Sequence, residues 1–505
     1  MAATRGLRRT AAAVLAVAAL ALAGTIPASA VPPADELATE LTRDVTVEGM
    51  NRHLIALQRI ADANGGNRAA STPGHEASAD YIAGTLRAAG FDVTTPAFTY
   101  DAEVVEVATL TVGGAAVEIV PMSFSPSTPA GGVSGPLVVA PADGSSGCEA
   151  TDYAGADLTG AIALSQRGTC PFAQKAAVAA DGGAVAAVIY NNVEGPLDGT
   201  LGDAAAARLP TVGISQADGQ ALAAAPGAPT TLDLQIRIEE RTTRNVIAQT
   251  RTGRTDNIVM AGGHLDSVEE GPGINDNGTG SAALLETALQ LGSTPTVGNA
   301  VRFTWWGAEE LGLLGAEAYV AGLSFEQQLD IAMYLNFDMV GSPNAAYFAY
   351  DGDDSNAEGA GPGPFGSAQI EAAFVDYLQG TVGVPVEGTD FSGRSDYGPF
   401  IAVGIPSGGL FTGADGIKTP EQAAKWGGTA GLAYDPCYHQ ACDTLGNVDR
   451  VALDRNGDTI AWVTATYAVN TESINGVPPR SERAALRTAS IRTLAAQPYR
   501  NDPTV

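Results

Sequence analysis

The chain has 505 residues, more than one hydrophobic core usually serves, so at least two folded units are expected. Its 56 acidic side chains outnumber the 27 basic ones and give a net charge of −29 at pH 7. Such a charge repels phosphate backbones and anionic membrane surfaces, which argues against nucleic-acid binding and favours solubility outside the cell.

The first 30 residues have the features of a secretory signal peptide. Three arginines precede an apolar run over residues 11–24, and Ala28-Ser29-Ala30 offers an A-x-A cleavage site. The run is too short to span a bilayer comfortably, and no later stretch of the sequence approaches about 20 apolar residues. We therefore expect cleavage near Val31 rather than a retained anchor, and a secreted, extracellular protein without membrane contact.

Two helices and a strand are predicted in the first part of the mature chain, after a Pro-rich linker over residues 31–43. Apolar residues recur at helical spacing over 47–63, where a following Asn-Gly-Gly sequence supplies a C-cap. A second helix is expected over 77–89, and residues 91–100 alternate like a strand.

The composition changes over residues 113–235, which are rich in Gly, Pro and Ala with short β-branched runs and indicate a separate inserted module. Strand signals return at 245–248 and 257–260, and helices then alternate with strands to about residue 470. This alternation predicts an α/β sheet with helices on both faces. The last segment, 474–505, is locally basic and is expected to be a solvated helical tail or a processed extension outside the core.

Only four cysteines occur, and an exported chain is expected to use them in two structural disulfides. Pairing of neighbours, Cys148 with Cys170 and Cys437 with Cys442, is the simplest arrangement, although three connectivities are formally possible. A disulfide across the second pair would close a tight loop around His439 and hold its imidazole in place.

Three apolar strands each run into residue types that bind metal ions. In chain order the strands lead to His264 and Asp266, to Glu309 and Glu310, and to Asp338. Open α/β sheets place active sites at the carboxyl ends of their strands. A Gly-rich loop between the first two strands presents Asp276, whose carboxylate could bridge two cations.

Imidazole and carboxylate suit zinc, and two zinc ions about 3.5–4 Å apart can share one carboxylate and one water, whose pKa falls toward neutrality. The expected ligands are His264 and Asp338 on one ion, Glu310 and His439 on the other, and Asp276 across both. Asp266 is expected to orient the His264 ring. Glu309 is the expected general base, and Tyr438 the expected donor to the oxyanion on the scissile carbonyl.

Each of these residues also has an ordinary interpretation when taken alone. A Glu-Glu pair is more often the start of a solvated helix, and Asp276 by itself would suit a turn. Only the complete set is informative. The two remaining histidines, His53 and His75, are expected to be ordinary surface residues.

At these residues the sequence closely resembles the secreted bacterial aminopeptidase S family of co-catalytic zinc exopeptidases, over about residues 44–110 and 243–470. The matching motifs are AGGHLDSV, GINDNGTGSAALLETAL, WWGAEELGLLG, YLNFDMVGSP, GRSDYGPF, GGLFTGA, KWGGTAG and DPCYHQACD. The resemblance implies the zinc exopeptidase fold, a central mixed but mostly parallel sheet between helices, and assigns the same ligands, base and tyrosine. It also implies a metalloaminopeptidase that acts on peptides with a free N-terminus through a zinc-bridging water.

The resemblance further implies a specificity pocket and a calcium site. The pocket would be lined by Met339, Gly393, Arg394 and Phe411 and would suit leucine-like or aromatic side chains, with the free amine held by Glu309 and Asp338. Calcium would bind to Asp44, the Val45 carbonyl, Asp454 and Asp458, since oxygen ligands suit this cation. Alternatively, Asp454 and Asp458 are solvated helix carboxylates.

The inserted module resembles a protease-associated (PA) domain, mainly β in structure and without catalytic residues. Covering the cleft, binding a partner and acting as an inert spacer are all open roles for it. The predicted division is a signal peptide (1–30), a linker (31–43), a peptidase domain in two parts (44–112 and 236–473), the PA insert (113–235) and a tail (474–505).

We expect a monomeric aminopeptidase that binds two zinc ions and a calcium ion. Two alternatives to this function stay open. One is a metal-free receptor or binding protein on the same fold, against which the intact ligand set argues. The other is a carboxypeptidase or a glutaminyl-cyclase-like acyl transferase, which would keep similar ligands around a differently shaped pocket.

Overall fold

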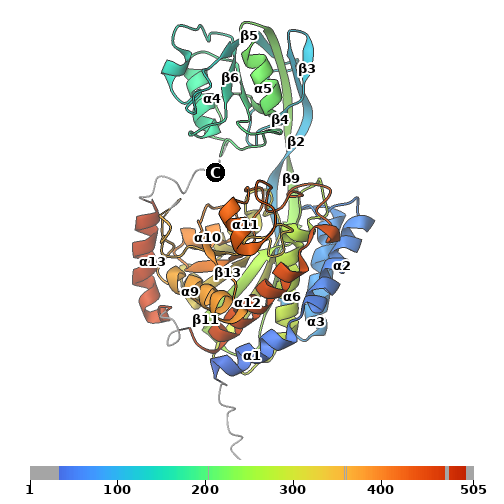
Figure 1. The fold of residues 1–505 in the computed structure, drawn as a ribbon, viewed down its shortest axis with the longest axis vertical. Coiled ribbons are helices and arrows are strands. Elements are labelled where there is room, and N and C mark those ends of the chain that lie inside the picture. The colour runs from blue at the N-terminus through green and yellow to red at the C-terminus, as the bar shows by residue number, and fades with distance from the viewer. Residues whose placement is uncertain (1–32, 203, 358, 360, 472–476, 496–505) are drawn as a thin grey trace, which may run out of the picture.

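The computed structural model describes residues 33–202, 204–357, 359, 361–471 and 477–495. The predicted signal peptide, 1–30, and the end of the predicted tail, 496–505, lie outside these residues. Figure 1 shows a larger, helix-rich part and a smaller part above it. They are joined by two long strands, β2 (Ala97–Val112) and β9 (Pro229–Arg244).

An eight-stranded mixed sheet forms the centre of the larger part. Its strand order is β1 (Asp92–Thr94), β10 (Val246–Gln249), β12 (Asn299–Trp306), β11 (Arg254–His264), β13 (Ile331–Phe337), β16 (Ser407–Phe411), β14 (Phe348–Tyr350) and β15 (Glu387–Thr389). The strands β12, β11, β13 and β16 run parallel to one another, whereas β10 and β14 run antiparallel to this group. The predicted mixed sheet with a parallel centre is confirmed.

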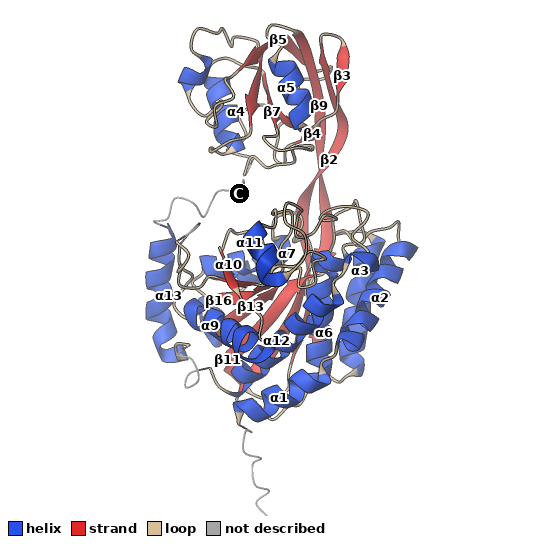
Figure 2. Ribbon diagram, in the orientation of Figure 1, coloured by secondary structure: helices blue, strands red, loops and turns tan. Residues whose placement is uncertain are grey.

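Helices cover both faces of this sheet, as Figure 2 shows. Successive strand residues point to opposite faces, so Val259 and Ala261 of β11 belong to one apolar core, and Ile258 and Met260 to another. The first core includes residues of α1 (Ala34–Asp44), α2 (Val47–Ala63), α3 (Pro73–Ala88), α6 (Gly280–Leu291), α9 (Ser367–Tyr377) and α12 (Arg450–Val469). The second includes residues of α7 (Leu314–Ala321) and α10 (Tyr397–Ala402).

The local sequence explains where the first elements begin and end. The helix α2 has its predicted range. It begins at Val47 because the Thr46 side chain accepts a hydrogen bond from the Gly49 N–H and caps the first turn. The helix α3 begins earlier than predicted, at Pro73, because Thr72 caps it. The strand predicted over 91–100 is divided into β1 and β2 around Pro96, which has no N–H for a strand hydrogen bond.

Both ends of the described chain belong to the folded domain, contrary to the sequence-based expectation. The predicted linker over 31–43 forms most of α1, which packs along α12 and buries Ala38 and Leu41. The predicted solvated tail forms α13 (Arg480–Ala495), which buries Arg483 and Arg487. The Arg483 guanidinium donates to the carbonyl oxygens of Pro478 and Leu329 at 3.0 and 2.9 Å, and this explains how a basic helix docks onto the core.

The two histidines expected at the surface are also buried. His53, only 5% exposed, lies between the Tyr81 hydroxyl at 2.7 Å and the Glu286 carboxylate at 3.1 Å. His75 is fully buried in the first turn of α3, where its Nε2 lies 3.0 Å from the Arg244 carbonyl oxygen. Each ring has a polar partner that is distant in the sequence, which the local sequence does not reveal.

In the residues that the structure describes, the smaller part is a second eight-stranded sheet with two short α-helices and a 3-10 turn at Ala150–Tyr153. Its strand order is β3 (Ala115–Val117), β2, β9, β5 (Val133–Val139), β6 (Ile162–Gln166), β7 (Ala186–Tyr190), β8 (Thr211–Ile214) and β4 (Val120–Pro121), and its helices are α4 (Phe172–Asp181) and α5 (Gln216–Ala223). The strands β2 and β9 pair antiparallel from Ala97 opposite Arg244 to Val112 opposite Thr230. They form one continuous ribbon from the larger part into the insert.

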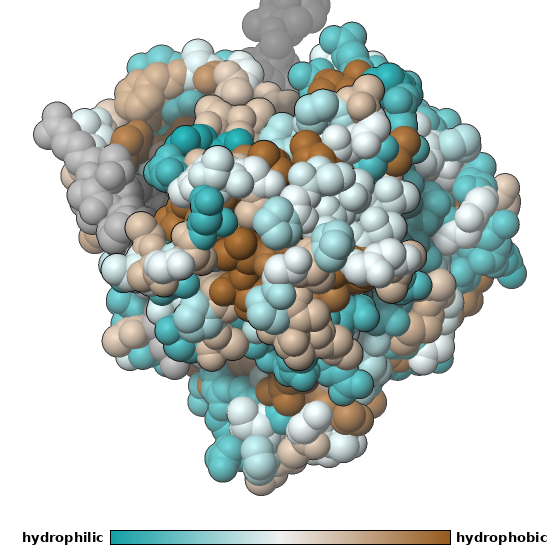
Figure 3. Space-filling view, turned by 90° about the horizontal axis from the view of Figure 1, so that it is seen from above, coloured by the Kyte–Doolittle hydropathy of each residue, from teal (hydrophilic) through white to brown (hydrophobic). Residues whose placement is uncertain are grey.

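Both predicted disulfides are present, Cys148–Cys170 in the insert and Cys437–Cys442 beside the second histidine candidate. Seen from above in Figure 3, the surface is largely hydrophilic or neutral, and apolar residues gather in small separate patches. Within the part of the chain that the structure describes, no helix has both the length and the apolar character that crossing a membrane requires.

Candidate active site

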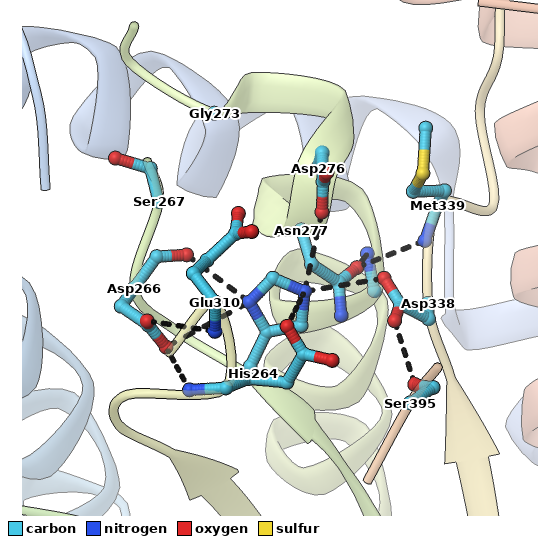
Figure 4. A network of polar contacts seen from close by, with 12 residues as sticks. His264, Asp266, Ser267, Gly273, Asp276, Asn277, Glu310, Asp338, Met339 and Ser395 are labelled. Carbon is cyan, nitrogen blue, oxygen red and sulfur yellow. Dashed lines mark hydrogen bonds and ion pairs between the residues drawn. The ribbon is translucent and has the colours of Figure 1, made fainter. Parts of the chain in front are cut away.

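The structure brings the five predicted metal ligands together at one end of the central sheet. His264 is the last residue of β11, Asp338 follows β13, and Asp276 lies in a short helical turn, Ile274–Thr279, ahead of α6. Glu310 follows β12, and His439 lies in the loop closed by the Cys437–Cys442 disulfide. Figure 4 shows how the side chains from separate strands converge.

Asp276 lies between the two histidines. His264 Nε2 is 3.2 Å from Asp276 Oδ1 and 3.3 Å from Asp338 Oδ1. His439 Nε2 is 3.3 Å from Asp276 Oδ2 and 2.9 Å from Glu310 Oε2. The two oxygens of Asp276 therefore face different histidines, as a carboxylate that bridges two cations must do.

The donor set fits a centre with two metal ions. His264, Asp276 and Asp338 form one cluster whose ligand atoms lie within 4.8 Å of one another, and Asp276, Glu310 and His439 form a second. The side chains are nitrogen and oxygen donors of the kinds that zinc binds. Glu310 Oε1 is buried and has no hydrogen-bond partner among the described residues, which is costly unless a cation accompanies it.

The carboxylates of the site outnumber its imidazoles, and the pKa values reflect this imbalance. Burial opposes the positive charge of His264, but Asp338 and Glu309 outweigh it and raise the pKa of His264 well above its ordinary value. Burial raises the pKa of Glu310 to about 7 and that of Glu309 well above the usual range. The site is thus an assembly of buried acidic donors that bound cations would stabilise.

The Asp266 carboxylate lies on the Nδ1 side of the His264 ring, whereas Nε2 of the ring faces the other predicted ligands. Its Oδ1 accepts a hydrogen bond from the Glu309 N–H at 3.2 Å, and its Oδ2 lies 3.4 Å from the Glu310 nitrogen. Its Oδ1 is 3.7 Å from His264 Nδ1, which has its closer partner in the Asp266 backbone carbonyl at 3.2 Å. Asp266 therefore joins the end of β11 to the loop that carries both glutamates.

Glu309 and Tyr438, the predicted catalytic pair, both line the cavity above the ligands. Glu309 Oε2 lies 3.9 Å from His264 Nε2, beside the ligand cluster. The Tyr438 ring stacks on the His439 ring with centroids 3.8 Å apart, and its hydroxyl accepts a hydrogen bond from Arg394 Nη2 at 3.2 Å. The phenolic proton is then available to a substrate in the cavity.

Three of the four residues predicted for specificity also line this cavity: Met339, Arg394 and Phe411. Gly393 lies beside it and donates its N–H to the Tyr397 hydroxyl at 2.9 Å. The wall is completed by residues that carried no expected role, among them Tyr350, Thr389, Asp390 and Ala414. The cavity therefore has both aromatic and polar walls.

The residues predicted to bind calcium lie where α1 meets α12, away from this cavity. Asp44 is exposed and pairs with Arg43 at 2.9 Å. Burial and the neighbouring Asp454 raise the pKa of Asp458 to about 7. Among the described residues, the side chains of Asp44, Asp454 and Asp458 do not form a cluster with ligand atoms within 4.8 Å of one another.

Several residues that support the ligands were missed in the sequence, although some stand in the quoted motifs. Ser395 Oγ donates to Asp338 Oδ2 at 2.6 Å. The side chain of Asn277 bonds to the Phe337 carbonyl and the Met339 N–H, on both sides of Asp338. A serine or an asparagine carries no metal-ligand signal of its own, so only the fold shows what these side chains touch.

Asp443 was missed for the same reason. Its two carboxylate oxygens accept hydrogen bonds from the backbone N–H groups of Asn275 and Asp276 at 2.8 and 3.0 Å. Because Asp443 directly follows the Cys437–Cys442 loop, it ties the segment that carries His439 to the segment that carries Asp276.

The site lies at the end of the larger domain that faces the insert. Figure 1 places α10 and α11 (Pro420–Trp426) at this end. Ser395 lies two residues before α10, and the His439 loop follows α11 in the chain. A mixed α/β sheet with two clusters of zinc-type ligands at its strand ends defines the class of metal-dependent hydrolases with the exopeptidase fold.

Comparisons with known proteins identify the family. The chain matches the model of peptidase family M28 over residues 245–464 and that of the PA domain over residues 133–222. It is 50% identical over 456 residues to a Mycobacterium tuberculosis protein described as a probable lipoprotein aminopeptidase, LpqL, covering 90% of this chain and 91% of the relative. It is 48% identical over 395 residues to an Aspergillus fumigatus protein described as probable leucine aminopeptidase 2, covering 76% of each.

Among solved structures, the zinc aminopeptidase BSAP from Bacillus subtilis matches with a TM-score of 0.66 and 27% identity, covering 86% of this chain and 98% of that one. The chain belongs to peptidase family M28 and carries a PA domain within it. The resemblance noted in the sequence, including the PA insert, is confirmed.

Proposed function

We propose that the protein is a secreted zinc aminopeptidase that holds two zinc ions and releases N-terminal residues from peptides, with a preference for large hydrophobic side chains such as leucine. The observation that carries this proposal is the pair of ligand clusters that share Asp276, with the Glu309 carboxylate beside them. The ligands would be His264 and Asp338 for one ion, Glu310 and His439 for the other, and Asp276 for both.

Bound zinc would supply a water of lowered pKa and polarise the scissile carbonyl. Glu309 lies beside the clusters without belonging to either, so it takes the proton of the attacking water and delivers it to the leaving amine. Tyr438 donates its phenolic hydrogen to the oxyanion, since its oxygen already accepts from Arg394.

The proposed preference for a free N-terminus and a large hydrophobic side chain rests on the residues that line the cavity. Glu309 and Asp338 present carboxylates that would hold a protonated α-amine, which only a free N-terminus provides. Met339 and Phe411 offer an apolar surface to the first side chain of the substrate. The description of the fungal relative as a probable leucine aminopeptidase 2 agrees with that preference.

Secretion is the proposed fate of the chain, and the mycobacterial relative is described as a lipoprotein. The A-x-A pattern before Val31 suits cleavage and release. A monomer with one calcium ion at the α1–α12 junction completes the proposal.

The test is to count zinc in the purified protein and to follow hydrolysis of leucine p-nitroanilide. We expect about two zinc ions per chain, and we expect Glu309→Gln to keep both while turnover falls by about 10²–10⁴-fold, as loss of a general base would cause. Glu317→Gln is the control, because Glu317 is an exposed residue of α7 outside the site and should keep wild-type turnover. A fully zinc-loaded protein without activity would contradict the proposal.

A further inference from the structure

Arg68 is a fully buried arginine next to the metal-ligand elements, in the loop between α2 and α3. It belongs to none of the motifs that carry the ligands. Every hydrogen bond that the structure shows for its guanidinium goes to a backbone carbonyl: Pro272 from Nε at 2.8 Å, Gly273 from Nη2 at 2.5 Å, and Leu265 from Nη1.

These three carbonyls belong to two different ligand-bearing segments. Leu265 directly follows His264 at the end of β11, whereas Pro272 and Gly273 lie in the loop that leads to Asp276. One planar guanidinium therefore fixes the spacing between both segments. The Arg68 backbone strengthens this link, because its N–H donates to Ser267 Oγ at 2.9 Å and its carbonyl accepts from the Ser267 N–H at 3.3 Å.

The close approach to Gly273 shows how tightly the guanidinium fits. Gly273 has a φ of +60°, and a Cβ at this position would lie 2.3 Å from the Asp276 carbonyl oxygen, 2.5 Å from Ser267 Cβ and 3.1 Å from Arg68 Nη2. From the other side, Asp443 holds the backbone N–H groups of Asn275 and Asp276. The loop that carries the shared carboxylate is thus held between an arginine and an aspartate.

The charge of Arg68 also suits its place. Burial lowers the pKa of Arg68 to about 10, and four nearby carboxylates oppose this effect: Asp266, Asp443, Asp276 and Glu310. A buried cation without such surroundings would be costly. A neutral side chain of the same size would leave three buried carbonyls without their donors.

We propose that Arg68 is a positioning residue that sets the separation of His264 and Asp276 and thereby tunes the affinity and geometry of the metal centre. The inference rests on the proposed two-zinc centre. Lysine keeps the charge of Arg68 but has a single donor nitrogen, which cannot span three carbonyls on two segments as the guanidinium fork does.

The experiment compares Arg68→Lys with Arg483→Lys. Arg483 is a matched control, because it is equally buried and also bonds to backbone carbonyls across two elements, but it lies in α13, away from the ligands. Zinc affinity is measured by competition with a chromogenic chelator, and the geometry of the centre by the visible absorption of the Co²⁺-loaded protein. Circular dichroism verifies folding.

We expect Arg68→Lys to bind zinc about 10–100-fold more weakly than the wild type and to change the Co²⁺ spectrum, as loss of support for metal ligands does. Arg483→Lys should lower the unfolding temperature without either change. Wild-type affinity and spectrum in Arg68→Lys would overturn the inference, as would equal changes in both variants.

A second variant covers the case in which Arg68→Lys does not fold. Ser267→Ala removes the hydroxyl that accepts from the Arg68 N–H and that also donates to the Gly271 carbonyl oxygen at 3.0 Å, in the loop that leads to Asp276. We expect a smaller decrease in zinc affinity in the same direction; no decrease would count against the inference. The wild-type zinc count separates the two claims. Fewer than two ions would refute the proposed centre, whereas two ions with unaltered Arg68→Lys would refute only the role of Arg68.

Discussion

Replacing Ser395 by alanine tests whether hydrogen bonds behind the ligands hold the metal centre together. Ser395 Oγ donates to Asp338 Oδ2 at 2.6 Å and accepts from Asn336 Nδ2 at 2.8 Å, so it connects a metal-ligand carboxylate to the interior of β13. A hydrogen bond to a charged group is worth about 1.5–3 kcal/mol. Since about 1.4 kcal/mol corresponds to a factor of ten, zinc affinity should fall by about 10–100-fold.

The assay is chelator competition at fixed pH, with Ser78→Ala as the control. Ser78 is fully buried and donates to the Gly74 carbonyl at 2.8 Å within α3, so its loss should lower stability but leave zinc affinity unchanged. If Ser395→Ala binds zinc as tightly as the wild type, the supporting role of Ser395 is wrong. If Ser78→Ala weakens binding equally, general destabilisation explains both results.

Three further predictions concern catalysis, the C-terminal helix and calcium. Tyr438→Phe should lower turnover of leucine p-nitroanilide by about 10²–10³-fold with unchanged zinc content, as loss of one oxyanion donor does; unchanged turnover would remove Tyr438 from the mechanism. Arg483→Met should cost about 2–6 kcal/mol in urea unfolding, because it leaves two buried carbonyl oxygens without their donor at about 1–3 kcal/mol each. Arg480→Met, which breaks partly exposed pairs with Glu326 and Asp330, should cost at most about 1 kcal/mol. Equal losses would contradict the docking of α13. Burial and Asp454 raise the pKa of Asp458 to about 7, so without calcium the folded state binds this proton more tightly than the unfolded state and stability should fall as the pH rises from about 4 to 7. Asp458→Asn should remove the contribution of this group and make the slope smaller. Calcium should raise the unfolding temperature at pH 8 in the wild type but not in the variant; an equal calcium response in both would exclude Asp458 as a ligand.

The sequence was sufficient to predict the fold class and the residues that converge on the site. Periodicity located α2, and the parallel strands β11 and β13 followed from apolar runs that end in His264 and Asp338. Metal-ligand residue types at the ends of parallel strands meet at one sheet edge whatever the loops between them do. This is why chain positions as far apart as 264 and 338 could be assigned to one centre.

Features that depend on long-range partners could not be predicted in this way. The basic composition of residues 480–487 suggested a solvated tail, because only the fold shows carbonyl oxygens that accept from Arg483. His53 resembled a surface residue until Glu286, more than 200 positions away, was placed beside it. Arg68 and Ser395 likewise gain their significance from groups that are distant in the sequence.

The most direct test of the account compares two leucine peptides that differ only in an N-acetyl group, digested by the zinc-loaded protein and analysed by mass spectrometry. Glu309 and Asp338 are proposed to hold a free amine, so the free peptide should lose its N-terminal leucine and the acetylated peptide should stay intact. Equal cleavage of both peptides, or removal of C-terminal residues, would contradict the proposed aminopeptidase.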